Sequence, residues 1–211
     1  MTLSVAIRTI SKRREMLHEL LARLTSAPVA QGVLRIKVAP FDDVAPNENA
    51  CRAIEGAAQF GADWIIFLED DAGPVDDFFG SVTRWLDDHS VDDVHLYPLG
   101  GVYGVSNVPC VRWPIEQFFC SVALALRGAM ATSLVEYLRA NAHVRTGFDI
   151  MSGHWHRTVS NSPFLIAAQP CLVDHLGDES TLIDTRPGRN VVGHFSRFLG
   201  RDYSYEGHKH G

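Results

Sequence analysis

The sequence contains no hydrophobic run long enough to cross a membrane and no cysteine pattern that indicates a disulfide framework or a zinc site. Its longest apolar runs, residues 64–68 and 122–126, are strand-sized, whereas a membrane helix needs about 20 apolar residues. The four cysteines are scattered and no two form a CxxC pair, which is typical of free thiols in a reducing compartment. No basic segment followed by an apolar stretch opens the chain, so a secretory signal is not visible. We therefore expect a cytoplasmic protein without stable membrane insertion.

The signature motifs of several enzyme classes are also missing. The sequence has no GxxxxGK[ST] loop, no GxGxxG after the first expected strand, no HExxH and no GxSxG turn. A sugar nucleotidyltransferase would need a glycine-rich loop after its first strand, and residues 8–12 contain no glycine. That class is therefore disfavoured.

The overall composition is ordinary for a globular domain. Of 211 residues, 46% are hydrophobic and 21% are charged, which is enough to form one sizeable core, so residues 1–211 are expected to form a single domain. The net charge of −6 is unevenly distributed: residues 1–40 carry seven basic and two acidic groups, whereas residues 41–100 carry two basic and fourteen acidic groups. Solvated helix faces explain part of this asymmetry, but the acidic segment also suits a cation and the basic segment suits phosphates.

Apolar strands and amphipathic helices alternate along the chain. The pattern predicts helices between five strands, which fall at residues 4–7, 33–38, 64–68, 94–97 and 121–126. Ser11 is expected to cap the first helix, and the helix of residues 47–60 is expected to end at Gly61. Residues 98–114, rich in Gly and Pro, are expected to form a long loop. Alternation of this kind predicts an α/β fold, a three-layer sandwich whose mostly parallel central sheet is covered by helices on both faces.

Polar residues follow several of these strands, at the edge of the sheet where α/β proteins bind their ligands. The first strand ends in Arg8 and Thr9, and the third runs directly into Glu69, Asp70 and Asp71. Three adjacent carboxylates repel one another unless a cation or hydrogen-bond donors compensate them. Such oxygen clusters suit Mg²⁺ or Mn²⁺, which bind one or two carboxylates together with substrate phosphates. The alternative is an acidic cap on the helix that follows, for which Asp71 alone would suffice.

The order of these motifs resembles that of GT-A glycosyltransferases. Residues 64–71, WIIFLEDD, look like the strand and DXD motif of that family, and Asp42 and Asp43 look like the paired aspartates that follow the second strand of family 2-like members. Residues 53–63 resemble the helix that leads into the DXD strand, and residues 126–130 resemble the strand-to-helix junction of the acceptor half. The resemblance implies a nucleotide-binding α/β fold and transfer of a sugar from a nucleotide-sugar donor to a hydroxyl acceptor.

The resemblance also implies roles for individual residues. Residues 169–177 resemble the Pro-x-Leu-Val-x-His-x-Gly element of some family 25-like enzymes, and a late histidine, here His175, often completes the metal site of GT-A enzymes. The acidic motif is Glu-Asp-Asp rather than Asp-x-Asp, so Asp71 takes the position of the last acid, the usual direct ligand of Mn²⁺ or Mg²⁺, and Glu69 that of the first. For His175, a purely structural role is the alternative. The expected donor is a UDP-sugar. The residues expected to bind it are Arg8, Thr9, Asp42, Asp43, Arg52, Glu69 and Asp70.

The residues also fit the chemistry of sugar transfer. Departure of the nucleotide diphosphate develops negative charge, which a metal ion at Asp71 would stabilise as a Lewis acid. Arg8 and the basic residues 12–14 could add positive charge there, unless they are only a solvated helix start. An inverting enzyme also needs a general base, worth about 10²–10⁴ in rate. Asp149, the only acid within residues 137–173, is the candidate base. The alternative role for this residue is a helix cap. The alternative chemistry is a retaining mechanism, which needs no such base.

The identity of the acceptor does not follow from the sequence. Residues 1–98 form the expected nucleotide-sugar half and residues 99–185 the acceptor half, and residues 186–211 form a basic tail that could close over the diphosphate as a lid. The candidate acceptors are a glycan, lipopolysaccharide core, a protein, and hydroxymethylated bases of DNA, as in phage-type DNA glycosyltransferases. The net charge of −6 argues against tight DNA binding. The alternative of another class is a non-catalytic sugar-nucleotide binding module.

Overall fold

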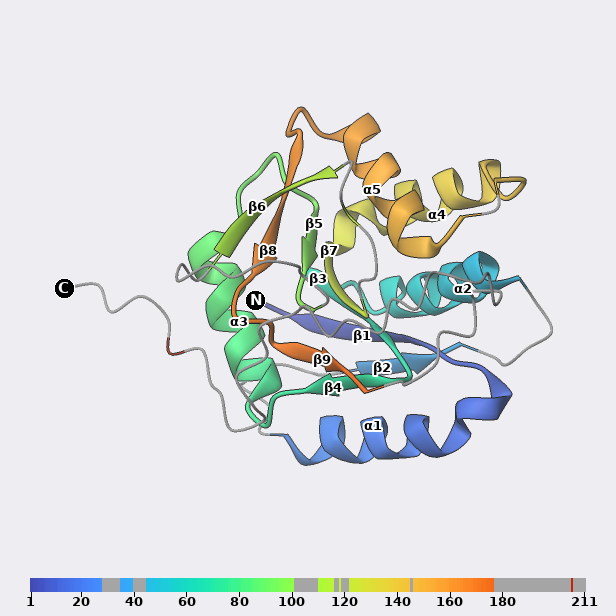
Figure 1. The fold of residues 1–211 in the computed structure, drawn as a ribbon, viewed down its shortest axis with the longest axis vertical. Helices are drawn as coiled ribbons and strands as arrows, with labels where there is room; N and C mark the ends of the chain where they lie inside the picture. The colour runs from blue at the N-terminus through green and yellow to red at the C-terminus, as the bar shows by residue number, and fades with distance from the viewer. Residues whose placement is uncertain are drawn as a thin grey trace, which may run out of the picture.

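A five-stranded mixed sheet forms the centre of the molecule, in the order β2-β1-β3-β7-β5 (Figure 1). Its strands are β1 (Leu3–Arg8), β2 (Arg35–Val38), β3 (Trp64–Glu69), β5 (Leu96–Pro98) and β7 (Ala123–Arg127). β1 pairs in parallel with β2 and β3, whereas β7 runs antiparallel to β3 and β5. Four of the five strands therefore share one direction, and the predicted α/β class with a mostly parallel sheet is confirmed. The computed structural model describes residues 1–27, 35–39, 45–100, 110–115, 118, 122–144, 146–176 and 206.

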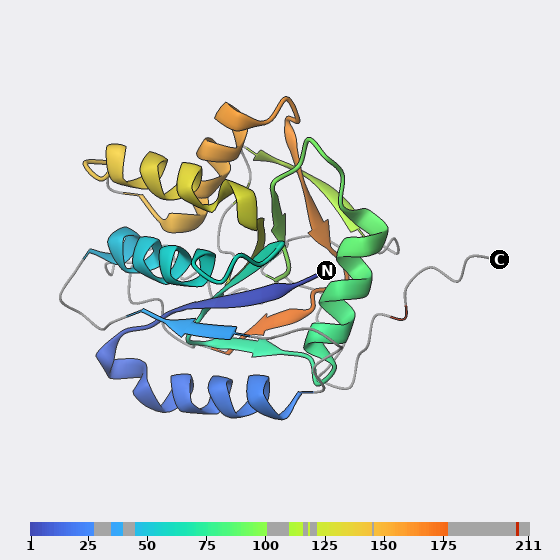
Figure 2. The same cartoon turned by 180° about the vertical axis from the view of Figure 1, so that it is seen from behind.

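Helices cover both faces of this sheet, and its central strand β3 is accordingly apolar and buried from Trp64 to Leu68. Successive side chains of β3 point to opposite faces, so that Ile65 and Phe67 join one core while Ile66 and Leu68 join the other. The two opposite views show the layers on either side of the sheet (Figure 1 and Figure 2). The first core contains residues of α2 (Pro46–Ala58), α4 (Ala131–Ala140) and α5 (Phe148–Val159), and the second contains residues of α1 (Arg14–Ser26) and α3 (Phe78–His89). The predicted three-layer sandwich is therefore confirmed.

Two local predictions are wrong. Ser11 does not cap α1 but begins a short 3-10 helix, η1 (Ser11–Arg13), and Ile10 before it makes no side-chain cap bond. Residues 98–114 are not a loop throughout, because β6 (Cys110–Pro114) pairs antiparallel with β8 (Phe164–Ala168). The hydrogen bonds that define β6 come from a distant segment, so its local sequence, rich in turn residues, does not reveal it.

A second small sheet continues from the end of β3. β4 (Ala72–Pro74) follows the acidic residues of the β3 end and pairs antiparallel with β9 (Val173–His175). Leu172 N, just before β9, also donates to the carbonyl oxygen of Leu99 at 2.9 Å. The late segment of the chain is thereby held against the carboxyl end of the central sheet.

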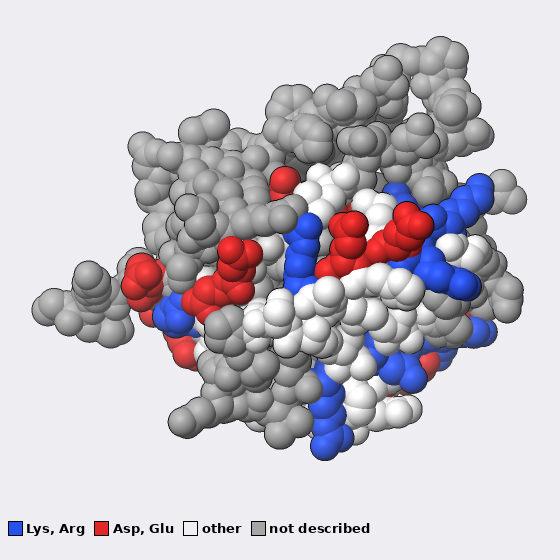
Figure 3. Space-filling model, turned by 90° about the horizontal axis from the view of Figure 1, so that it is seen from below, with Lys and Arg blue, Asp and Glu red and all other residues white. Residues whose placement is uncertain are grey.

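The surface near α1 carries charges of both signs. Seen from below, Lys and Arg side chains lie next to Asp and Glu side chains (Figure 3), and Arg14, Glu15 and Glu19 of α1 are all exposed. The described part of that face is therefore mixed in charge. Two of the cysteines, Cys51 and Cys171, are buried free thiols. No helix in the described part of the chain is both long enough and apolar enough to cross a membrane.

Candidate functional site

The parallel register of β1 and β3 brings the polar strand ends together. Arg8 is the register partner of Glu69, and its Nη2 forms an ion pair with Glu69 Oε1. One residue further along each strand, the Thr9 hydroxyl donates to Asp70 Oδ2 over 2.8 Å. Because the carboxyl ends of parallel strands meet at one edge of a sheet, side chains that are 61 residues apart form one cluster.

Asp70 is a buried carboxylate with both oxygens occupied. Oδ2 accepts from the Thr9 hydroxyl and from the Ile10 backbone N–H, and Oδ1 accepts from Arg13 Nη1 at 3.0 Å. Only 4% of the residue is exposed. These bonds hold the chain that follows β1 against the end of β3, so Asp70 braces this loop.

Asp71 and His175 meet because β4 and β9 pair. Ala72, which follows Asp71, is the register partner of His175, and Leu176 N donates to the carbonyl oxygen of Asp71 at 2.9 Å. His175 Nε2 consequently lies 3.0 Å from Asp71 Oδ2. Asp71 is only 1% exposed, and its Oδ1 has no hydrogen-bond partner among the described residues. A buried acceptor of this kind is costly unless a donor or a cation compensates it, so Oδ1 marks a position suited to a ligand.

Two acids of the cluster, Asp71 and Glu69, differ in their electrostatic environment. Burial alone would raise the pKa of Asp71, but the hydrogen bond with His175 and the charges of His175 and Arg13 outweigh it and hold that pKa below its ordinary value. The same hydrogen bond raises the pKa of His175. Burial raises the pKa of Glu69, and the ion pair with Arg8 offsets this only in part. Asp71 is therefore held ionised beside a cation, whereas burial favours the neutral form of Glu69.

Asp71 and His175 fit the metal that the family resemblance implies. Within the described residues, no group of three or more His, Cys, Asp or Glu side chains is arranged to hold a metal ion. The described chain would supply these two ligands, which suits Mg²⁺ or Mn²⁺ bound largely through phosphates and water. Asp71 Oδ2 is 3.0 Å from His175 Nε2, so both side chains are within reach of one bound ion. The donor set and the unpartnered Asp71 Oδ1 are compatible with such an ion.

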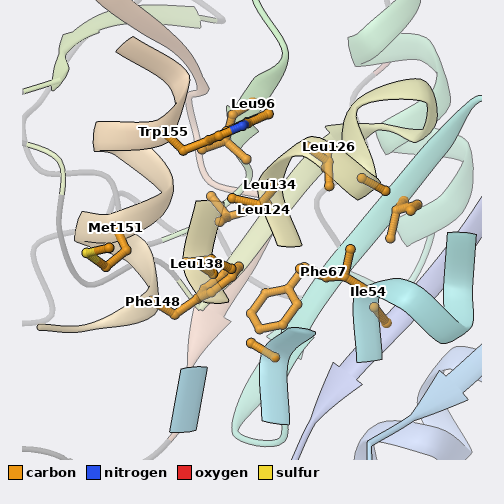
Figure 4. Packing of buried hydrophobic residues seen from close by; sticks show 14 of the residues in the cluster. Ile54, Phe67, Leu96, Leu124, Leu126, Leu134, Leu138, Phe148, Met151 and Trp155 are labelled. Carbon is orange, nitrogen blue, oxygen red and sulfur yellow. The ribbon is translucent and has the colours of Figure 1, made fainter. Parts of the chain in front are cut away.

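Asp149 lies in the first turn of α5, at the same end of the sheet. The ring of Phe148 packs against Phe67 of β3 with the ring centroids 4.3 Å apart (Figure 4). Phe67 is two residues before Glu69, so this contact brings the start of α5 to the end of β3. The charge of Asp149 adds to the burial that raises the pKa of Glu69. Gly147 leaves room for the carboxylate, because a Cβ there would be 2.5 Å from Asp149 Oδ1. The role of Asp149 as a base stays a prediction.

Asn49 is a member of the cluster that the sequence did not reveal. It lies near the start of α2, is 2% exposed, and its Nδ2 donates to the Thr9 carbonyl oxygen at 2.9 Å. Its Oδ1 is buried and has no partner among the described residues. The signal that could have found it is one polar residue on the apolar face of a helix, in line with Ala53 and Ala57.

Other predicted residues do not join this cluster. Arg52 Nε lies 3.3 Å from Glu48 Oε1, and Glu48 also accepts hydrogen bonds from Arg139 of α4. Arg52 therefore belongs to a surface network that links α2 to α4, and its contact with a nucleotide stays a prediction. Asp42 and Asp43 lie outside the described residues, as does most of the basic tail.

The fold is similar to that of solved structures of S. aureus TarS, although no family model and no curated protein matches the sequence. S. aureus TarS 1–349 in complex with UDP-GlcNAc aligns with a TM-score of 0.54 and 13% identity, over 85% of this chain and 62% of the TarS chain. The same protein in complex with UDP aligns with a TM-score of 0.54 and 13% identity, over 82% and 60% of the two chains. The present chain thus spans less than two thirds of solved TarS. At this identity the similarity shows a shared α/β fold.

Proposed function

We propose that the protein is a metal-dependent glycosyltransferase that transfers a sugar from a UDP-sugar to a hydroxyl acceptor with inversion. The observation that carries this proposal is the contact between the buried Asp71 carboxylate and His175 at the carboxyl end of β3. The fold similarity to TarS, which has been solved with UDP-GlcNAc and with UDP, supports the choice of donor. The order of the sequence motifs points to the same class.

Four residues of the site have a defined task in this proposal. Asp71 and His175 would hold Mn²⁺ or Mg²⁺, which supplies Lewis-acid stabilisation of the charge on the departing diphosphate. Arg8 Nη1 is buried and has no partner among the described residues, so it is a donor suited to a phosphate or ribose oxygen. Asp149 would accept the proton of the acceptor hydroxyl as that oxygen attacks the sugar.

The binding part of the proposal is tested by thermal unfolding with a panel of nucleotides and nucleotide sugars, with and without Mn²⁺. UDP-sugars with Mn²⁺ are expected to raise the unfolding midpoint of the native protein, because ligand at 100 times its Kd adds about 2.7 kcal/mol. The Asp71→Asn variant should lose the Mn²⁺-dependent part of this shift. Asp87→Asn, an exposed acid on α3, is the matched control. The absence of a shift with every nucleotide would contradict the proposed function.

The catalytic part is tested by donor hydrolysis and by an acceptor panel. Slow release of UDP from a UDP-sugar in water, lost in Asp71→Asn, is expected of an enzyme and not of a binding module. The acceptor panel should contain glycans and duplex DNA with hydroxymethylated bases. Transfer to the DNA would identify the phage-type activity, and transfer to a glycan would exclude it as the main reaction.

A further inference from the structure

Arg13 lies against the carboxylate that the expected metal would bind. A single guanidinium nitrogen, Nη1, is 3.0 Å from Asp70 Oδ1 and 2.5 Å from Asp71 Oδ2. The same Asp71 oxygen is 3.0 Å from His175 Nε2. The Arg13 side chain is only 13% exposed. The guanidinium therefore bridges two buried carboxylates and shares one Asp71 oxygen with the imidazole.

A divalent ion at Asp71 would place a second cation beside this guanidinium, on the same carboxylate. An ion bound through Asp71 Oδ2 would be about 2.1 Å from that oxygen, within a few ångströms of Arg13 Nη1. Two cations at such a separation repel each other strongly where water is largely excluded. Without an ion, however, Arg13 is needed, because adjacent buried carboxylates are costly unless a cation is paired with them.

A bound diphosphate would remove this conflict. Guanidinium groups bind phosphate oxygens in a bidentate geometry. The negatively charged diphosphate of a donor could therefore replace Asp71 as the partner of the Arg13 guanidinium. Asp70 would stay compensated after such a move, because the Thr9 hydroxyl and the Ile10 N–H still donate to its Oδ2. Asp71 would exchange the guanidinium for the ion and keep His175 beside it.

We propose that Arg13 is a positioning residue that makes metal binding depend on donor binding. In the protein without donor, its guanidinium is paired with Asp71 Oδ2 and its positive charge disfavours a metal ion on either oxygen of that carboxylate. The donor diphosphate draws the guanidinium away, and the divalent ion then binds Asp71 and His175 together with the diphosphate. This inference rests on the proposed function, and it predicts a metal affinity that is low without a nucleoside diphosphate and high with one.

The test is a calorimetric titration with Mn²⁺, in the absence and presence of saturating UDP, for the native protein and three variants. Arg13→Gln is expected to bind Mn²⁺ without UDP about tenfold more tightly than the native protein, and the gain that UDP gives should shrink by about the same factor. Arg13→Lys keeps the charge but not the planar fork, so about a threefold change in the same direction is expected. Arg84→Gln is the matched control, because Arg84 of α3 forms a guanidinium–carboxylate pair with Asp77, the N-cap residue of the same helix, and not with Asp70 or Asp71. Circular dichroism checks that each variant is folded.

The outcomes separate the two proposals. If UDP promotes Mn²⁺ binding to the native protein but neither Arg13 variant binds Mn²⁺ more tightly without UDP, the role of Arg13 is wrong and the proposed function stands. If the native protein binds UDP but never Mn²⁺, metal dependence fails and the role of Arg13 fails with it. If it binds no nucleoside diphosphate, the proposed function itself fails. Should Arg13→Gln not fold, the Arg13→Lys titration decides the question alone.

Discussion

His175 Nε2 lies 3.0 Å from Asp71 Oδ2, although 104 residues separate the two in the chain. The contact depends on a short antiparallel pair, in which β4 begins directly after Asp71 and β9 ends at His175. The parallel register of β1 and β3 places Arg8 and Thr9 beside the same acidic residues. The candidate site is thus assembled from two independent strand pairings that meet at the carboxyl end of β3.

Asp71→Asn should abolish sugar transfer and leave the fold intact. Asparagine keeps the size of the side chain but removes the charge that a metal ion needs as a ligand, and excess EDTA should have the same effect on the native protein. The measurement is the rate of UDP release or of transfer, with circular dichroism as a check on folding and Asp87→Asn as the control. Full activity in Asp71→Asn, or in excess EDTA, would refute the metal-dependent mechanism.

Asp149→Asn should separate the role of base from a structural role in the first turn of α5. Asparagine cannot take a proton, so transfer should fall by about 10²–10⁴ while binding of UDP-sugar and Mn²⁺ persists. The N-cap of α5 is Gly147, so a structural role of Asp149 would be a favourable charge in the first helical turn. Such a role predicts nearly normal activity. The measurement is kcat beside a calorimetric Kd for the donor. A kcat within a few-fold of the native value would reject Asp149 as the base and favour a retaining mechanism.

Thr9→Val should destabilise the protein. The substitution removes a hydroxyl that donates to the buried Asp70 carboxylate at 2.8 Å, and loss of one hydrogen bond to a buried charged group costs about 1–3 kcal/mol. Urea unfolding measures the change. Thr25→Val is the control, because Thr25 is exposed on α1 and its hydroxyl bonds only to carbonyl oxygens of its own helix. Equal stability of the two variants would show that Thr9 does not brace Asp70.

His156 should make the protein less stable in mild acid. The side chain is fully buried in α5 with its ring against His95, and burial together with the charge of His95 lowers the pKa of His156 to about 4. The unfolded chain has an ordinary histidine pKa of about 6.5, so it binds the proton first as the pH falls. Stability is therefore complete above about pH 6.5 and is lost between there and about pH 4, by up to about 3 kcal/mol.

The measurement for His156 is the free energy of unfolding in urea at several pH values between 7 and 4. A His156→Gln variant, which cannot take the proton, should show a flatter dependence on pH, whereas His143→Gln, an exposed histidine, should follow the native protein. Identical pH dependence in native protein and His156→Gln would contradict the assignment.

Much of the architecture was predictable because it depends on local patterns. The unbroken apolar run of β3 indicated a strand buried on both faces, and Gly61 indicated the end of α2, where its φ of 63° suits glycine. The acidic residues after β3 indicated a ligand-binding edge of the sheet. Carboxylates next to a buried strand are costly unless a cation or a hydrogen-bond donor compensates them.

The sequence by itself determined the α/β class, the strand ends that carry polar residues, and the acids that form the cluster. Only the tertiary structure decided that β7 runs antiparallel to β3, that β6 pairs with β8, and that Asn49 and Arg13 contact the strand-end loop and its carboxylates. The physical reason is that strand pairing is made by backbone groups that every residue carries. Its direction and register therefore leave no local mark, and the side-chain contacts that depend on them exist only once distant segments have met.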